Sequence, residues 1–177
     1  MSQDNIFREI DEELRGDRMR ALWRRFAPFV IGAAVAVVAI VAINEGWTWY
    51  HSNNAAQSSD ELYAAFDLVD GGDLAGAQTQ LDALIADGSG NYPVLAEFRK
   101  AGLLAVQGNA AEAVAAYDKL ANEQSNPHLR ELALVLAGTI LVDTGSVADV
   151  ETRVGSIAAE GSALRNPARE ALGLAQY

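Results

Sequence analysis

An uninterrupted apolar stretch near the N-terminus constrains the fold of this 177-residue chain more than any other feature. The eighteen residues 26–43 (FAPFVIGAAVAVVAIVAI) carry no charged side chain. As a helix rising about 1.5 Å per residue, they span about 27 Å, close to the hydrocarbon thickness of a bilayer. Pro28 would lie in the first turn of that helix, where its missing N–H costs little. The stretch predicts a single transmembrane anchor at residues 26–50.

A cleaved signal peptide and a buried core helix are two other interpretations of this stretch. Twenty-five residues, six of them acidic, precede it, and no A-x-A-like cleavage site follows, which disfavours a signal peptide. Aromatic side chains at both ends are typical of membrane interfaces and disfavour a core helix. We therefore expect a retained anchor, with these residues at the two interfaces: Arg15, Arg18, Arg20, Trp23, Arg24, Arg25, Trp47, Trp49 and Tyr50.

Arginines indicate the direction in which the anchor crosses the membrane. Five of them lie between Arg15 and Arg25, opposed only by Asp17, and the next basic residue after the apolar stretch is Arg99. Because positive charge is retained on the cytoplasmic side, the N-terminus is predicted to be cytoplasmic. Residues 51–177 would then lie on the far side of a bacterial inner membrane, in the periplasm.

Residues 1–25 are predicted to form a cytoplasmic amphipathic helix that begins after Asp4. Ile6, Phe7, Ile10 and Leu14 recur at helical spacing and form one apolar stripe. We favour a helix that lies on the membrane surface with its arginines on anionic headgroups. A helix that docks on a cytoplasmic or membrane partner is the alternative.

Composition excludes several classes of function for the second half of the chain. Residues 51–177 carry seventeen acidic and seven basic side chains, so this part lacks the basic surface that nucleic-acid binding needs. The absence of cysteine excludes disulfides, thiol catalysis and cysteine-based metal sites. Ala, Leu and Val dominate while aromatic residues are few, which favours an all-α fold.

Three segments that each begin with a glycine repeat along the second half: GDLAGAQTQL from Gly72, GNAAEAVAAY from Gly108 and GSVADVETRV from Gly145. The glycines are 36 and 37 residues apart, and each lies between two apolar helical segments. Helices often end on a glycine with positive φ, so each glycine is predicted to form the turn of a helix hairpin. A polar linker at residues 51–59 would precede this repeat domain of residues 60–177.

Small and apolar residues recur at matching positions on both sides of these glycines. Leu81 and Val154 occupy the position of Tyr117. We expect the following residues to pack the paired helices together: Ala65, Gly72, Ala77, Ala101, Gly108, Ala113, Tyr117, Gly138 and Gly145.

Proline dipeptides separate the predicted hairpins, at Tyr92-Pro93, Asn126-Pro127 and Asn166-Pro167. The last of these opens a partial fourth hairpin, which ends within its first helix at Tyr177. This helix is either a cap or the start of a unit whose remainder is missing. Because Leu172 and Leu174 need a partner, we expect the natural chain to continue.

The pattern resembles the tetratricopeptide repeat (TPR), a helix hairpin of about 34 residues. The unit from Val94 to Asn126 is the most similar, although no unit has the early tryptophan of the family. The opening IFREIDEELRGDRMRALWRRF, the single span and the exported hairpins together resemble the YfgM-like family of membrane-anchored TPR proteins. That resemblance implies an ancillary role beside the Sec translocon and periplasmic chaperones.

No motif in the sequence predicts catalysis, a metal site or a cofactor. His51 and His128 have no paired carboxylate at ligand spacing. Gly88-Ser89-Gly90 lacks the frame of a nucleophile elbow, and Gly71-Gly72 lacks that of a phosphate loop. We therefore expect neither an enzyme nor a small-molecule substrate.

Stacked hairpins instead predict a concave surface formed by the first helix of each pair. Helical spacing nominates an apolar protein-binding groove made of Leu62, Phe66, Val69, Leu95, Phe98, Ala105, Leu132, Val135 and Val142. The alternative is that these side chains simply pack between helices.

The favoured function is a membrane-anchored periplasmic scaffold, chaperone-like in action, that assists the Sec translocon and the maturation of secreted proteins. A structural accessory subunit of another inner-membrane complex, such as a respiratory or division assembly, is the alternative.

Overall fold

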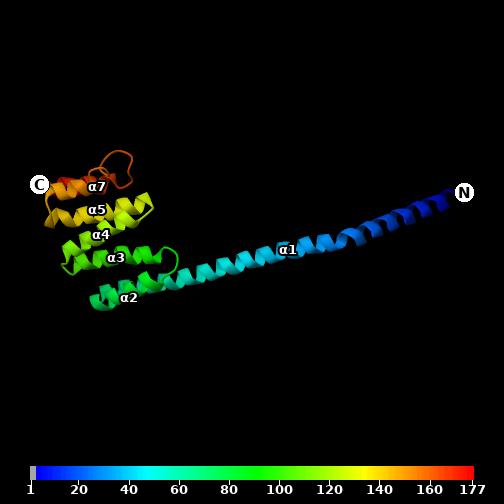
Figure 1. Cartoon of the computed structure of the whole chain (residues 1–177), viewed down its shortest axis with the longest axis horizontal. Coiled ribbons are helices and arrows are strands. Elements are labelled where there is room, and N and C mark those ends of the chain that lie inside the picture. The colour runs from blue at the N-terminus through cyan, green and yellow to red at the C-terminus, as the bar shows by residue number, and fades with distance from the viewer. Residues whose placement is uncertain (1–2) are drawn as a thin grey trace. The chain divides into compact units, whose positions relative to one another are not determined.

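The computed structural model describes the backbone of residues 3–177 and the side chains of residue 20 and residues 23–177. Every regular element in this part of the chain is an α-helix. The chain divides into two compact units, Met1–Tyr50 and His51–Tyr177. The second unit contains the repeats and is where the helices pack against one another (Figure 1).

Helix α1 runs from Gln3 to Asp70 and joins segments that the sequence predicted to be separate. Residues 4–25 are helical as expected, but no break follows them, so Pro28 lies inside the helix rather than in its first turn. A proline within a helix removes one backbone hydrogen bond, and here the bond lost is that to the carbonyl of Arg24. The helix nevertheless continues past this missing hydrogen bond through the Ala- and Val-rich residues that follow Pro28.

The predicted linker 51–59 is helical and continues α1 towards the second helix α2. Its small side chains allow close packing: Ser58 is only 3% exposed. The backbone N–H of Ser89, in the turn after α2, donates a hydrogen bond of 2.9 Å to the Ser58 hydroxyl oxygen. The segment is therefore part of the repeat unit and not a spacer in front of it.

One helix near the N-terminus is long and apolar enough to span a membrane. Its most apolar window has a mean hydropathy of 2.7, and none of that window is buried against the protein. The large side chains between Phe26 and Ile43 are exposed, as are Trp23, Trp47, Trp49 and Tyr50 at its two ends. Exposed apolar side chains of this number need an apolar medium or a partner.

Six further helices follow: α2 (Leu74–Asp87), α3 (Tyr92–Val106), α4 (Ala110–Glu123), α5 (Pro127–Thr144), α6 (Val147–Val154) and α7 (Arg165–Ala175). Each helix from α2 to α6 packs against the next, and α7 packs against both α5 and α6 (Figure 1). Residues 51–70 of α1 share a core with α2 and α3. Residues 51–70, α3 and α5 are called the first helices below, and α2, α4 and α6 the second helices.

The proline dipeptides begin helices rather than forming the loops between them. Pro93 lies in the first turn of α3 and Pro127 opens α5. Pro167 falls in the first turn of α7, which the sequence predicted to open at Asn166-Pro167. Proline is favoured in a first turn because its fixed φ suits the helix and its missing N–H would be unpaired there anyway. Helices α3, α5 and α7 therefore begin at or just before these dipeptides rather than after them.

Two of the three repeat glycines form the expected turn, and the third does not. Gly72 and Gly108 have φ values of 82° and 85°, whereas Gly145 has a φ of −116°. The reason is the residue that follows, because Ser146 forms a capping box with Asp149 and requires extended backbone at the start of α6. A Cβ at position 145 would lie 2.8 Å from Cδ2 of Leu141, so a larger residue there would require that side chain to move.

Helix α6 is short, and a looped segment connects it to α7. Within this segment the Ser162 hydroxyl donates to Glu131 of α5 over 2.8 Å, and Ile157 is buried. Arg169 of α7 donates to the carbonyl of Ala158 over 2.8 Å. These contacts fix α7 against the third pair of helices, with Ala168 and Ala171 buried.

Candidate protein-binding surfaces

Six of the nine residues predicted to pack the paired helices are buried: Ala65, Ala77, Ala101, Ala113, Tyr117 and Gly138. The other three, Gly72, Gly108 and Gly145, are exposed between helices. Two helices approach closely at Gly138 of α5, where a Cβ would lie 2.6 Å from Cγ1 of Val154 in α6. Small residues are thus placed where two helices of a pair touch.

Tyr117 of α4 shows how one aromatic side chain fills the second pair. Its hydroxyl donates to the carbonyl of Phe98 over 3.2 Å, and its ring lies 6.1 Å from that of Phe98. Burial raises the pKa of the Tyr117 phenol above its usual value, and the charge of Arg99 opposes part of this rise. Tyr117 therefore has a structural role as a neutral side chain at physiological pH.

The predicted interface residues at the ends of the apolar stretch are exposed where they are described. These are Arg20, Trp23, Arg24, Arg25, Trp47, Trp49 and Tyr50. The side chains of Arg15 and Arg18 lie outside the described residues.

The nine residues predicted to line an apolar groove do not form one continuous surface. Leu62 and Val135 are buried in the core, and only Leu95, at 45%, is largely exposed. Phe66, Val69, Phe98 and Val142 are partly buried and pack against core clusters, and Ala105 and Leu132 are also partly buried. For most of these positions, packing between helices is what the structure shows.

A smaller cavity of about 160 Å³ lies between the first helices α1 and α3. It is lined by Val69, Arg99, Gly102, Leu103 and Val106. The guanidinium of Arg99 lies 4.3 Å from the centroid of the Phe66 ring, a cation–π contact that holds the arginine over the aromatic face. Of the nine predicted groove residues, only Val69 lines this cavity.

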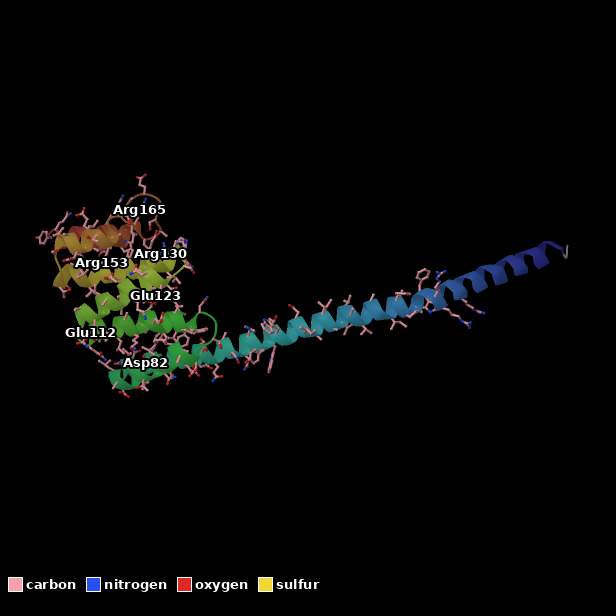
Figure 2. The ribbon with its side chains drawn as sticks, in the orientation of Figure 1. Asp82, Glu112, Glu123, Arg130, Arg153 and Arg165 are labelled. Carbon is pink, nitrogen blue, oxygen red and sulfur yellow. The ribbon has the colours of Figure 1, made fainter. Side chains whose placement is uncertain are left out.

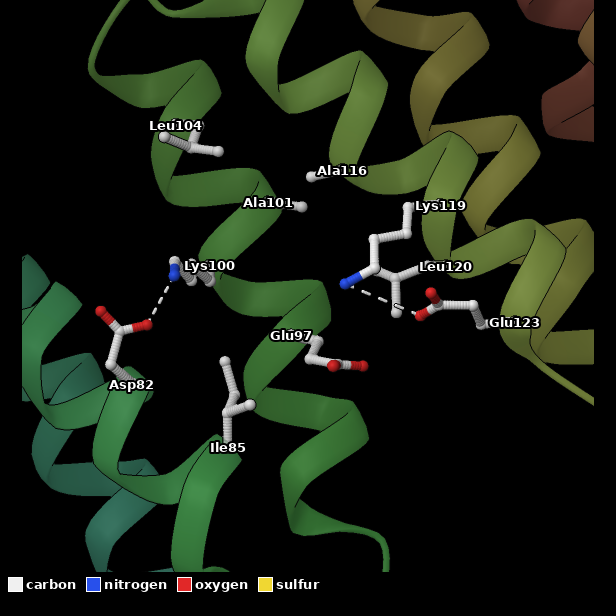
Figure 3. Close-up of a pocket in the computed structure, with 10 residues that line it drawn as sticks. All are labelled: Asp82, Ile85, Glu97, Lys100, Ala101, Leu104, Ala116, Lys119, Leu120 and Glu123. Carbon is white, nitrogen blue, oxygen red and sulfur yellow. Dashed lines mark hydrogen bonds and ion pairs between the residues drawn. The ribbon is translucent and has the colours of Figure 1, made fainter.

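A larger cavity of about 330 Å³ lies on the other side of the repeats, between α2, α3 and α4 (Figure 3). We call it the second-helix cavity, and sequence reasoning did not predict it. Its lining combines an apolar floor with charged side chains at the mouth: Asp82, Ile85, Glu97, Lys100, Ala101, Leu104, Ala116, Lys119, Leu120 and Glu123.

The charged groups at the mouth are only partly paired. Lys100 contacts Asp82 at 2.5 Å, and Lys119 contacts Glu123 at 3.8 Å (Figure 3). Glu97 takes part in no ion pair within the part of the chain that the structure describes. Three carboxylates against two ammonium groups leave the mouth with a net negative charge.

The next junction along the repeats is closed by a different ion pair. Arg153 of α6 donates to the Asp118 carboxylate of α4 through Nε at 3.0 Å and through Nη2 at 2.7 Å. The two side chains are 22% and 32% exposed. These hydrogen bonds raise the pKa of the Arg153 guanidinium, because they favour its charged form.

These surfaces offer the kind of lining that protein side chains bind. Both cavities have mostly apolar linings that side chains of another protein could contact. Among the residues searched, which are those that the structure describes, no three His, Asp or Glu side chains are grouped to hold a metal ion.

Comparison with known proteins agrees with this architecture. The model of the tetratricopeptide repeat-like domain family matches residues 20–162, which is well over half of the chain. No curated protein and no solved structure matches the chain. The matched segment includes the apolar stretch and helices α2 to α6. Paired helices, small residues at their contacts and the family match lead to one conclusion: the chain belongs to the tetratricopeptide repeat-like domain family.

Proposed function

We propose that this protein is a membrane-anchored scaffold that holds protein partners next to the membrane and catalyses no reaction itself. Its binding domain comprises three hairpins and a partial fourth, and it faces the periplasm. The observation that carries the proposal is that a domain of a protein-interaction family follows, in one chain, a helix long and apolar enough to span a membrane.

The proposed role is assistance to the Sec translocon and to the maturation of secreted proteins. Its support is the resemblance of the N-terminal sequence to the YfgM-like family, together with the two apolar cavities of the repeat unit. The arginine-rich segment before the span would orient the chain with its repeats outside the cytoplasm.

Protease accessibility tests the topology. Protease added to intact spheroplasts should digest the repeat unit of the full chain, whereas in intact cells the outer membrane should protect it. A cytoplasmic control protein should survive in both preparations. Survival of the repeat unit in spheroplasts, with digestion only after lysis, would contradict the proposed orientation.

Photo-crosslinking in intact cells tests the partner class. A photoreactive residue at Leu95, which is exposed on a first helix, should capture a translocon component or a secretory chaperone. The same residue at Glu112, exposed on a second helix, is the matched control; because neither position lines a cavity, the comparison is between a first helix and a second helix. Capture of neither class from Leu95 would count against the proposal.

Replacement of the span distinguishes this scaffold from an accessory subunit of another membrane complex. With residues 26–43 exchanged for an unrelated apolar span, a tethered scaffold should retain its crosslinks through the repeats. An accessory subunit that contacts its complex through the span should lose them.

A further inference from the structure

The two junctions between successive second helices can be compared residue by residue. Counted from the repeat glycines, the eighth position is Gln80, Ala116 and then Arg153. The tenth position is Asp82, then Asp118. The pair that closes the second junction, Asp118 with Arg153, therefore corresponds at the first junction to Asp82 with Ala116.

Asp82 receives its counter-charge from another direction. Lys100 of the first helix α3 pairs with it, whereas the residue of α5 that matches Lys100 is Ala137, which is buried. The cation has thus moved from a second helix to a first helix. The side chain that would cross from α4 to α2 is missing, and both Ala116 and Asp82 line the second-helix cavity (Figure 3).

The second-helix cavity accordingly occupies the place that an arginine side chain occupies at the next junction. Ala101 and Leu120 form its buried floor, and Ile85 and Leu104 form half-buried walls. Figure 2 shows Asp82 on α2 and Arg153 on α6, with Glu123 of the intervening helix α4 labelled between them. The cavity has an acidic mouth and an apolar interior, and it lies in a unit that carries seventeen acidic and seven basic side chains.

We propose that the second-helix cavity binds an amphipathic helix of a partner protein, which inserts one arginine side chain where the repeat itself has Ala116. The guanidinium would reach Asp82 and Glu97, and an apolar side chain one turn away would contact Ile85 and Leu104. A guanidinium suits this position because it pairs with carboxylates through two parallel hydrogen bonds while its stem covers apolar surface. The inference rests on the proposed function and specifies the partner.

The substitution Ala116→Arg tests the proposal because it supplies the missing side chain from within. The introduced guanidinium should fill the cavity and pair with Asp82 as Arg153 pairs with Asp118. The matched control is Ala115→Arg, which adds the same charge at the exposed neighbouring position outside the cavity. Equal melting temperatures for the wild type and the Ala115→Arg variant, with an equal or higher value for the Ala116→Arg variant, show that all three are folded.

The probe is a blocked, fluorescein-labelled peptide of about 18 residues, a length at which an alanine-based helix is measurably populated. It carries leucine and arginine four residues apart, and a second peptide has glutamate in place of the arginine. Fluorescence anisotropy is measured with the full chain in detergent micelles. The arginine peptide should bind the wild type and the Ala115→Arg variant equally, and the Ala116→Arg variant at least about tenfold more weakly.

Three results would overturn the proposal. The arginine peptide could bind no better than the glutamate peptide, or Ala116→Arg could leave its affinity unchanged. The wild type could also form dimers in sedimentation that Ala116→Arg disrupts, in which case the occupant is a second copy of this chain. If the Leu95 crosslinks persist in any of these cases, the scaffold function stands and only the assignment of this cavity fails.

Discussion

The two junctions between the second helices carry different side chains at corresponding repeat positions. At the later junction Arg153 crosses to Asp118, and the two side chains are at most one-third exposed. At the earlier junction Asp82 pairs with Lys100 of the first helix α3, and a cavity of about 330 Å³ remains between α2, α3 and α4. The space between two second helices is closed where the cation is on a second helix, as with Arg153, and stays open where the cation is on a first helix, as with Lys100. Binding capacity can therefore differ between repeats of one domain.

Truncating the core beneath each junction has the largest expected effect. Leu120 and Ile157 lie twelve residues after their repeat glycines and are 4% and 3% exposed. Replacing either with alanine should lower the free energy of unfolding by about 2–5 kcal/mol. Leu120→Ala should cost less than Ile157→Ala, because the adjoining cavity lets water and neighbouring side chains relax around it. Urea unfolding in micelles measures both, and the reverse order would contradict an open first junction.

Breaking the ion pair of the closed junction comes next. Arg153→Ala should lower the free energy of unfolding by about 1–2 kcal/mol, between the values for exposed and buried pairs. The control is Arg130→Ala, since Arg130 is exposed and donates to the Gln124 carbonyl. The Arg130→Ala substitution should lower the free energy of unfolding by less than about 0.5 kcal/mol. Equal losses in the two variants would mean that Arg153 does not close the junction.

The ion pair of the open junction should matter less. Lys100→Ala should change the free energy of unfolding by at most about 0.5–1 kcal/mol, because Lys100 and Asp82 are 35% and 47% exposed. Adding Ala116→Arg to Lys100→Ala should restore the loss, since it recreates the arrangement of the later junction. Thermal unfolding of the single and double variants checks this, and an additive loss in the double variant would show that the two junctions are not equivalent.

The smallest effect concerns the start of α6, which places Arg153 in register. Hydrogen bonds from Ser146 hold the pKa of the Asp149 carboxyl below its usual value. Because the pKa is lowered by folding, its contribution to stability is present at neutral pH. It should be lost as pH falls from the unfolded value of about 3.9 through the lower folded value. Ser146→Ala should raise the pKa of Asp149 towards that unfolded value, as followed by NMR titration, and no change would rule out the capping box.

Sequence patterns predicted the pairing of helices well, because that pairing depends on small residues at fixed spacing. Ala65, Ala101 and Gly138 are buried as the pattern requires. Boundaries were less well predicted, since Pro93 and Pro127 start helices rather than mark loops. Residues 51–59 are polar but helical, because burial of Ser58 depends on a hydrogen bond from Ser89 that no local pattern shows.

The binding surfaces were predicted less well than the fold. Helical spacing identifies which residues face inwards, but it does not distinguish a groove from a core, so Leu62 and Val135 were nominated although they are buried. The second-helix cavity had a sequence signal that was not used. In the three aligned segments, Gln80, Ala116 and Arg153 share one position, and their difference in size and charge marks where the junctions diverge.

The packing of each helix against its neighbours in sequence also determines how the repeat unit can assemble. From α2 to α7 the extensive contacts join helices that are adjacent or next but one along the chain. Closing such short loops costs little entropy, and chains with local contacts fold quickly. A polypeptide that is delivered N-terminus first can therefore bury each apolar face as soon as the next helix arrives. The order in which the helices leave the exporting or synthesising machinery is then also the order in which their contacts can form.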